Sequence, residues 1–540
     1  MIRFLALLLI SFQLYAVTLG EINSKPPSLA KNFLIWQYFK QDITSKEADA
    51  AFYQIRDVNR KLFFSYAKKS DRPEVVYTAK CMKMGRKSLE NSKDENCIKI
   101  AFSIGKAVYM TPENRVRIAE IVKKKTTTEL VGMLNDINFT RHLETYPPKL
   151  VLRLFNSVNS TFRQNNFNQP ITKAYMERLA AASGFTRSLI RALTVPGLDG
   201  YLNSMLQVDG TDRDGNTNFF LGLNQLRHGN TAKAIEHFQI AHAKAYYRMD
   251  KDKTLFWQYL AGKNDLILKK LSESVDINIY SLYAKEHYKI HPDNYFITLQ
   301  SSSKKSVKDL RDPFTWNKVL AEIKSTPKEQ LYDLAEEYDA KNLIPAQSFI
   351  VERASGYKLH GFIMPYDRYM KDLSRDDKAL YYALMRQESR FIPAALSRSF
   401  ALGLMQMMPF LVKALDKEVK YKRHSLHDMF DPKINLMYAK THIKWLQYRV
   451  YHPLFIAYAY NGGIGFTKRH ITQDGVFSNA PYEPFMSMEL MANSESREYG
   501  KKVLSNYVVY KKILGEEISI SHLFDTLKIP SQTDRFRVSK

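Results

Sequence analysis

Helical periodicity runs through most of this 540-residue chain and limits the folds that it can adopt. From about residue 25 to residue 340, apolar residues recur at the spacing of amphipathic helices, in segments of roughly 12 to 18 residues. The same region lacks the sustained apolar–polar alternation that indicates half-buried strands. The pattern therefore predicts an all-α fold.

One stretch of this region predicts a pair of antiparallel helices. Residues 219–246 fit one helix, a turn at Gly229, and a second helix with alanines and Phe238 on one face, and so resemble a tetratricopeptide-like hairpin. Such hairpins bury their apolar faces only against neighbours, which predicts a helical superhelix, an irregular α-solenoid, over residues 21–340. A turn-rich and aromatic stretch then predicts a small linker domain over residues 341–375. Residues 376–540 would form a further domain.

The first residues predict an exported protein. Arg3 precedes an apolar run over residues 4–15, and the small residues Ala16 and Gly20 follow. Because a membrane span needs about 20 apolar residues, this pattern favours a cleaved signal peptide over residues 1–20 rather than an anchor. No later segment predicts a membrane span. We therefore expect a periplasmic protein.

The chain has two cysteines, Cys81 and Cys97. In an oxidising compartment they could close a small loop, worth about 3 kcal/mol by the loop-entropy relation. The alternative is a pair of buried thiols, and the sequence leaves both open. Without a neighbouring histidine cluster they cannot form a structural zinc site.

The formal net charge of +25 predicts attraction to a polyanion. Export argues against nucleic acid as that partner and favours an acidic polymer of the cell envelope. A generally basic surface without a specific partner stays open.

Three patterns that could hold a metal ion or nucleotide do not satisfy the chemistry. Residues 209–218 would place Leu221 where a calcium loop needs its closing glutamate. His287 and His291 lack a third ligand. The glycines of residues 461–468 follow no strand and lack the ending of a phosphate loop. We therefore expect neither a metal ion nor a cofactor.

Glu388 is the first residue with a candidate chemical role. Residues 376–391 predict an amphipathic helix that ends before Pro393, which places Glu388 in its last turn. The helix dipole and apolar neighbours both disfavour a charged carboxylate there, so its pKa should rise toward that of a general acid at neutral pH. Ser389 is suited to orienting the carboxyl. Taken alone, Glu388 would be an ordinary solvated glutamate at a helix end, so the wider pattern has to support the catalytic role.

Three more motifs follow in order. Gly403 should open a helix from which Gln406 presents an amide among methionines. Asn461 follows two aromatic residues and precedes two glycines, and Glu495 and Tyr499 lie four apart on one helix face. The first two motifs also fit purely structural explanations when taken alone. The Gln406 motif could be a methionine-rich core helix, and the Asn461 motif could be a helix cap.

Taken together, the four motifs resemble the catalytic domain of soluble lytic transglycosylases, goose-lysozyme-like bacterial enzymes that cut peptidoglycan. That family has an ES pair, a GLMQ-type helix, an AYN-G motif and an E-x-R-x-Y motif in this order. Residues 431–446 also resemble its DP-x-x-N helix. The resemblance covers residues 373–514 closely. It implies a lysozyme-like, α-helical catalytic domain over residues 376–540.

Two positions depart from the family pattern. Phe400 stands where members commonly have a glycine, three residues before Gly403, and Gly462 stands where they commonly have alanine. The first departure should change the loop that carries Ser397 and Ser399. Neither removes a chemical group, so we expect the reaction to survive both.

The resemblance implies a reaction on peptidoglycan glycan strands. Glu388 would protonate the oxygen of the β-1,4 bond between N-acetylmuramic acid and N-acetylglucosamine, and then act as base toward the muramoyl 6-hydroxyl. The product would carry a 1,6-anhydro ring, without use of water. The implied substrate-binding residues are Ser389, Ser397, Met405, Gln406, Tyr460, Asn461, Glu495 and Tyr499.

Two alternatives remain. A hydrolytic lysozyme of the same fold would need a second carboxylate, for which Asp428 and Asp431 are candidates. None of the four motifs supplies an aspartate for that purpose, which favours the transglycosylase. The other alternative is a scaffold that binds envelope proteins through its solenoid and carries a degenerate catalytic domain.

Overall fold

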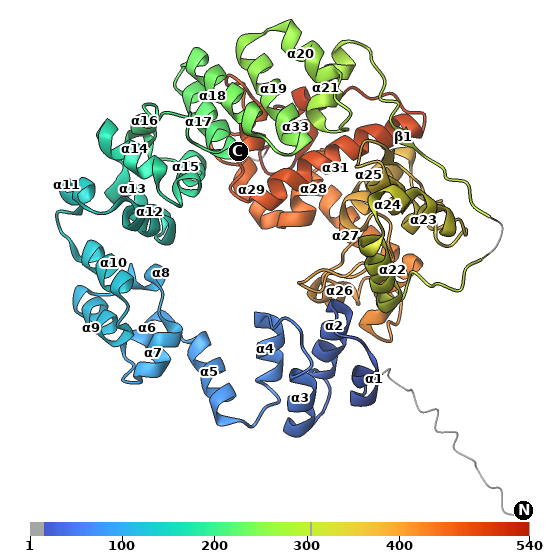
Figure 1. The fold of residues 1–540 in the computed structure, drawn as a ribbon, viewed down its shortest axis with the longest axis horizontal. Coiled ribbons are helices and arrows are strands. Elements are labelled where there is room, and N and C mark those ends of the chain that lie inside the picture. The colour runs from blue at the N-terminus through green and yellow to red at the C-terminus, as the bar shows by residue number, and fades with distance from the viewer. Residues whose placement is uncertain (1–15, 303–304, 539–540) are drawn as a thin grey trace, which may run out of the picture.

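The computed structural model describes residues 16–302 and 305–538, and its helices follow one another around a closed ring (Figure 1). The described residues contain 33 α-helices, so the predicted all-α fold is confirmed. Their only paired strands are β1 (Tyr295–Phe296) and β2 (His360–Gly361), which run parallel.

Helices α1 to α21 form most of the ring, and we call them the arc. The first ten are α1 (Leu19–Ser24), α2 (Leu29–Tyr38), α3 (Ser45–Phe52), α4 (Arg60–Tyr66), α5 (Pro73–Lys83), α6 (Arg86–Glu90), α7 (Glu95–Ala101), α8 (Ile104–Ala107), α9 (Pro112–Val122) and α10 (Lys125–Asn135). Most are shorter than the sequence predicts, because polar caps interrupt the periodic segments. Ser103, for example, caps the four-residue helix α8.

The rest of the arc continues the same pattern. It consists of α11 (Phe139–His142), η1 (Leu143–Thr145), α12 (Pro148–Ser157), α13 (Ser160–Phe167), α14 (Lys173–Ala181), α15 (Phe185–Thr194), α16 (Asp199–Met205), α17 (Gly215–Arg227), α18 (Thr231–Lys244), α19 (Arg248–Gly262), α20 (Asp265–Ser272) and α21 (Ile279–His287). The predicted hairpin is the pair α17 and α18, with Gly229 in the turn at φ 76°.

The beginning of the arc bears on the predicted signal peptide. Residues 1–15 lie outside the described residues, but α1 already begins at Leu19, and Thr18 caps it. Val17 is buried, and its carbonyl accepts a hydrogen bond from Gln41. Residues 17–20 thus belong to the folded arc, and the predicted signal peptide over residues 1–20 stays a prediction.

A disulfide settles the alternative that the sequence left open for the two cysteines. Cys81 of α5 is bonded to Cys97 of α7, with an S–S distance of 2.01 Å. The bridge therefore ties α5 to α7, the second helix after it in the arc.

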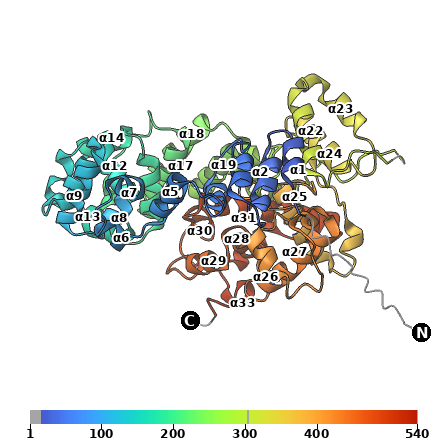
Figure 2. The same ribbon diagram turned by 90° about the horizontal axis from the view of Figure 1, so that it is seen from below.

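A small unit of three helices lies to one side of the ring (Figure 2). It contains α22 (Pro313–Ser325), η2 (Lys328–Gln330), α23 (Leu331–Glu337) and α24 (Ile344–Ala354). Its core is separate and runs from Leu310 to Ala354, with Ile392 and Ala394 packed against it. This core begins earlier in the chain than the linker domain that the sequence predicts, and the domain boundaries themselves stay predictions.

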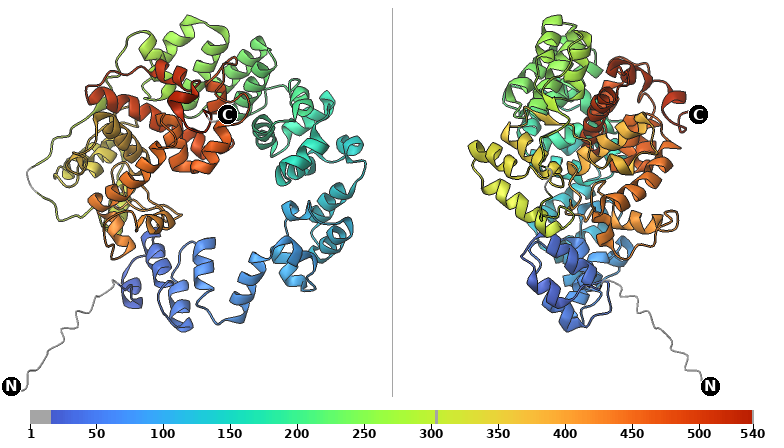
Figure 3. Two further views of the ribbon diagram at one scale, coloured as in Figure 1. Left: turned by 180° about the vertical axis from the view of Figure 1, so that it is seen from behind. Right: turned by 90° about the vertical axis from the view of Figure 1, so that its right-hand side faces the viewer.

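The remaining helices form the C-terminal unit, which lies along one side of the ring (Figure 3). They are η3 (Asp367–Tyr369), α25 (Arg375–Ser389), α26 (Pro409–Leu415), η4 (Leu426–Phe430), α27 (Pro432–Gln447), α28 (Pro453–Gly462), α29 (Ile464–Ile471), α30 (Phe485–Glu489), α31 (Ser494–Ile513), α32 (Ile520–Thr526) and α33 (Pro530–Thr533). The core of this unit is continuous with that of the arc. The arc therefore supports the C-terminal unit directly.

Within residues 16–302 and 305–538, no helix combines the length and apolar character needed to cross a bilayer.

Candidate active site

Glu388 lies in the last turn of α25, as the sequence predicts. The helix ends because Arg390 and Phe391 adopt left-handed backbone angles, with φ of 52° and 66°. The Tyr499 hydroxyl, from α31, donates a hydrogen bond of 2.7 Å to Oε1 of Glu388. Burial raises the pKa of Glu388 to about 8; the Tyr499 hydrogen bond lowers it in part, and the charge of Glu495 raises it. The carboxyl therefore keeps its proton at neutral pH.

A buried glutamate from the small unit fixes this last turn. Glu352 of α24 forms ion pairs with Arg386 and Arg390, the residues two positions before and after Glu388. Arg386 also donates to the Gly361 carbonyl and to Asn506 of α31, both at 2.8 Å. Sequence reasoning missed this support. The two arginines that flank Glu388 were the available signal.

The GLMQ segment differs from its predicted form. Gly403 does not open a helix: residues 403–406 form a turn between the paired residues Leu402 and Met407, and α26 begins only at Pro409. Gly403 has φ 73°, and a Cβ there would lie 2.2 Å from the Met429 carbonyl oxygen. Asn435 of α27 supports the turn, since its side chain accepts from the Met405 N–H and donates to the Leu402 and Met429 carbonyls. Contacts with residues some thirty positions away therefore override the local helical pattern.

Two predicted substrate contacts take part in this turn. The Gln406 amide donates to the carbonyls of Ala395 and Gly403, at 3.0 and 2.9 Å. The Met405 side chain is fully buried, while its carbonyl accepts a 2.7 Å hydrogen bond from the Tyr460 hydroxyl. Both residues thus shape the turn, and Tyr460 joins it to α28.

Asn461 and Glu495 come together, as their motifs suggest. The Asn461 amide donates to Oε1 of Glu495 at 3.4 Å, and its oxygen accepts a 2.7 Å hydrogen bond from Ser496. The departure at Gly462 has a physical reason here. A Cβ at this position would lie 2.6 Å from the Ser496 hydroxyl oxygen, so the glycine allows α31 to approach α28 closely.

Ser389 and Ser397, the two serines predicted to contact substrate, form hydrogen bonds with nearby backbone groups. The Ser389 hydroxyl donates to the Met385 carbonyl of its own helix, while the Tyr499 hydroxyl donates to Glu388. The orienting role of Ser389 stays a prediction. The Ser397 hydroxyl accepts from the Ala401 N–H and so closes the loop before Gly403.

Two aromatic side chains that sequence reasoning did not predict lie near the site. The His442 ring, on α27, lies 5.6 Å from the Tyr460 ring and stacks on Trp445 at 6.1 Å. The Trp445 side chain is 38% exposed. An exposed indole beside a polar site can offer an apolar face to a sugar ring. In the sequence, the only signal for this pair was the spacing of His442 and Trp445 on one helix.

The acids that a hydrolase would need have other partners. Asp428 accepts from the His424 N–H, and Asp431 caps α27 through the N–H groups of Lys433 and Ile434. Among the described residues, Glu495 is the one carboxylate whose charge affects the pKa of Glu388.

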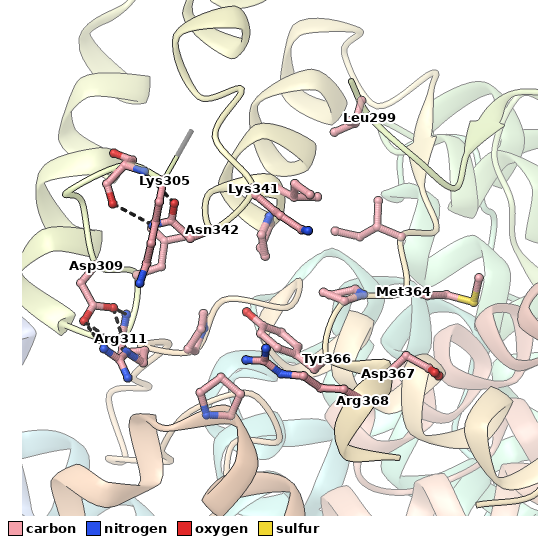
Figure 4. A pocket seen from close by; sticks show the side chains of 18 of the residues that line it. Leu299, Lys305, Asp309, Arg311, Lys341, Asn342, Met364, Tyr366, Asp367 and Arg368 are labelled. Carbon is pink, nitrogen blue, oxygen red and sulfur yellow. Dashed lines mark hydrogen bonds and ion pairs between the residues drawn. The ribbon is translucent and has the colours of Figure 1, made fainter. Parts of the chain in front are cut away.

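A cavity of about 1220 Å³ lies outside this group of residues (Figure 4). It opens between residues 297–299 and 305–311, the start of α24 and the 363–369 segment, and basic side chains such as Lys341 and Arg368 line it. None of the predicted catalytic and substrate-binding residues lines this cavity, whereas Asp431, a candidate second acid of the hydrolytic alternative, does. The candidate active site is therefore the group around Glu388.

Comparison with protein families identifies the class to which this site corresponds. Residues 368–482 match the family described as Transglycosylase SLT domain. The match spans Glu388, the Gly403 turn and Asn461, and confirms the resemblance that the order of the motifs indicated.

Two relatives are membrane-bound lytic murein transglycosylases C. The one from Edwardsiella ictaluri is 29% identical over 154 residues, and the one from Pectobacterium atrosepticum is 30% identical over 153 residues. Each alignment covers 25% of this chain and 43% of the relative. The similarity therefore spans less than half of the length of these relatives.

Solved structures extend the similarity in fold to nearly the whole chain. The lytic transglycosylase Slt of Pseudomonas aeruginosa, solved as an inactive mutant, has a TM-score of 0.54 at 14% identity, over 93% of this chain and 84% of that one. The 70 kDa soluble lytic transglycosylase of Escherichia coli has a TM-score of 0.50 at 14% identity, over 96% and 85%. At this identity the likeness concerns the fold.

Proposed function

We propose that this protein is a peptidoglycan lytic transglycosylase. Glu388 protonates the oxygen of the β-1,4 bond between N-acetylmuramic acid and N-acetylglucosamine, then takes the proton of the muramoyl 6-hydroxyl as that oxygen attacks the anomeric carbon. The bond to the leaving sugar breaks, a 1,6-anhydro ring forms, and no water is consumed. The observation that carries this proposal is the position of the Glu388 carboxyl in the last turn of α25, where burial raises its pKa and the Tyr499 hydroxyl donates to it.

The surrounding groups support one carboxyl in both roles. Water activation or covalent attack would require a second carboxylate at a defined distance. Asp428 and Asp431 are engaged as turn and cap residues, which argues against the hydrolytic alternative. Glu495 hydrogen-bonds to Asn461, a pairing suited to holding the acetamido group of a sugar rather than to activating water.

We assign the other residues according to their contacts. Tyr499 orients the carboxyl, and Asn461 and Glu495 bind sugar. Tyr460 and Gln406 hold the turn at Gly403, which would form one wall of the glycan site.

We further propose that the protein works in the cell envelope after removal of its signal peptide. The net charge of +25 would draw it to acidic envelope polymers, and its partner would be the glycan strand itself. Residues 376–540 would be the catalytic domain, and the arc would form the superhelical domain.

Replacement of Glu388 tests the proposal. Glu388→Gln keeps the shape of the side chain but removes the acid, so turnover of purified peptidoglycan should fall about a thousandfold or more, because general acid–base catalysis contributes on that scale. Thermal unfolding and binding to sacculi should stay as in the wild type. Products are identified by mass spectrometry, in which anhydro products are one water lighter than hydrolysis products.

The matched control is Glu483→Gln. Burial also raises the pKa of Glu483, to about 7, but this residue lies outside the proposed site. The control should turn over as the wild type does. An active Glu388→Gln variant would reject Glu388 as the acid, and an inactive wild type would favour the scaffold alternative.

A further inference from the structure

Phe400 occupies an unusual backbone conformation beside the proposed site. Its φ is 63°, in the left-handed region that glycine adopts easily and that strains other residues. This is the position at which the similar family commonly has glycine. The Phe400 side chain is nonetheless fully buried. A large residue in a glycine-like conformation calls for a compensating contact.

The compensating contact comes from the opposite end of the chain. The Phe400 ring packs against Phe33 and Trp36 of α2, with ring centroids 5.5 and 5.2 Å away. The amine of Lys61, at the start of α4, lies 5.4 Å from the Phe400 ring and 5.3 Å from the Trp36 ring. We call residues 29–66, which include these helices, the N-terminal arm.

The N-terminal arm also binds the backbone of the two residues before Phe400. Lys61 donates to the Ser399 carbonyl at 2.6 Å, and the Asn59 amide donates to the Arg398 carbonyl at 3.3 Å. Gln37 hydrogen-bonds to His427 at 3.1 Å. His427 lies two residues before Met429, whose carbonyl oxygen faces Gly403. The arm therefore holds two segments that meet at the turn of the proposed site.

A short path connects Phe400 with the proposed reacting groups. Leu402 pairs with Met407 through two backbone hydrogen bonds of 3.1 and 3.0 Å, which fixes the turn between them. Within that turn, the Met405 carbonyl accepts from Tyr460. Burial raises the pKa of the Tyr460 hydroxyl, and the charge of Glu388 raises it further, so the two groups lie near each other.

We propose that Phe400 is a positioning residue through which the N-terminal arm holds the loop of residues 395–407 in its active shape. The proposal rests on the proposed function. Without the aromatic contact, the loop is held by hydrogen bonds alone, namely its own and those from Asn59, Lys61, Asn435 and Tyr460. The arm thus completes the site from the far end of the arc, and closure of the ring is a requirement for full catalysis.

Phe400→Gly tests this role because glycine adopts the same φ without strain. The variant should fold as the wild type does. Its kcat on purified sacculi should fall about tenfold to a hundredfold, since small misplacements around a reacting centre have effects of that size, while KM changes less. Hydrogen exchange of residues 395–407 should become faster. Trp36→Ala removes the same contact from the arm and should act alike, which keeps the test valid if one variant fails to fold.

Phe410→Ala is the matched control, because Phe410 is a nearby aromatic residue that is 71% exposed. It should keep the kcat and the exchange rates of the wild type.

A crosslink separates positioning from other effects of the substitution. Asn59→Cys and Arg398→Cys, added to Phe400→Gly and joined by a short thiol-specific reagent, should restore kcat and slow exchange, because the link replaces the lost contact. Cys81 and Cys97 are already bridged and would not react. Wild-type kcat and exchange in Phe400→Gly, or no recovery on crosslinking, would overturn the proposal. Failure of the wild type to release anhydro products would instead reject the proposed function.

Discussion

Two of the contact regions between the arc and the C-terminal unit differ in character. In the first, which we call the charged seam, Lys501 of α31 donates to Glu489 and to the hydroxyl of Tyr280, which belongs to the arc. Tyr280 also donates to Glu489, and Glu498 forms an ion pair with Lys501 at 3.1 Å. Lys501 and Glu489 are buried.

In the second contact region, the aromatic seam, Phe33, Trp36 and Lys61 of the arc pack around Phe400. The difference between the seams is instructive. Removing one member of the charged seam leaves a buried charge without its partner, whereas removing a ring from the aromatic seam takes away packing that holds a loop in place. The charged seam should therefore govern the stability of α31, which carries Glu495 and Tyr499, and the aromatic seam should govern local order beside them.

The largest expected effect on stability comes from breaking the charged seam. Lys501→Met leaves Glu489 buried without its cation, so the free energy of unfolding should fall by about 3–5 kcal/mol. Urea denaturation followed by circular dichroism measures the change. Lys502→Met, at the exposed neighbouring position, should change stability by less than about 0.5 kcal/mol. A loss in Lys501→Met no larger than in this control would show that the two seams do not differ as described.

A smaller effect concerns acid. Burial alone would raise the pKa of Glu498, but the charges of Lys501, Lys253 and Arg497 outweigh it and hold that pKa below its ordinary value. A carboxylate whose pKa is lower in the folded than in the unfolded protein stabilises the fold at pH values above its unfolded pKa, here near 4.5. This stabilisation is lost as the pH falls below 4.5 toward the folded pKa.

Glu498→Gln should therefore lower the free energy of unfolding by about 1 kcal/mol at pH 7, a value reduced for the partial exposure of Glu498. The difference from the wild type should shrink as the pH falls from 5 to 3. Urea midpoints measured across this range test the expectation. If the difference in free energy of unfolding between Glu498→Gln and the wild type stays constant with pH, Glu498 does not stabilise the fold through the charged seam.

Local patterns predicted much of the molecule. The all-α fold, the hairpin of α17 and α18, and the position of Glu388 in the last turn of its helix all follow from periodicity, caps and turn residues close together in sequence. The spacing of Glu495 and Tyr499 on α31 is of the same kind, since residues four apart share a helix face.

Long-range contacts decided what the sequence did not predict. The turn at Gly403 replaces a predicted helix because Asn435 binds its carbonyls and an N–H group from another helix. Glu352 reaches the last turn of α25 from the small unit. The consequence of Phe400 depends on α2, more than 350 residues away, and no local pattern links the two.

Digestion of peptidoglycan in water enriched in oxygen-18 tests most directly whether Glu388 drives a cleavage that uses no water. Wild-type protein should release muropeptides with 1,6-anhydro ends that are one water lighter than hydrolysis products and carry no label, and Glu388→Gln should release almost none. Reducing ends that carry oxygen-18 would contradict the account and identify a hydrolase.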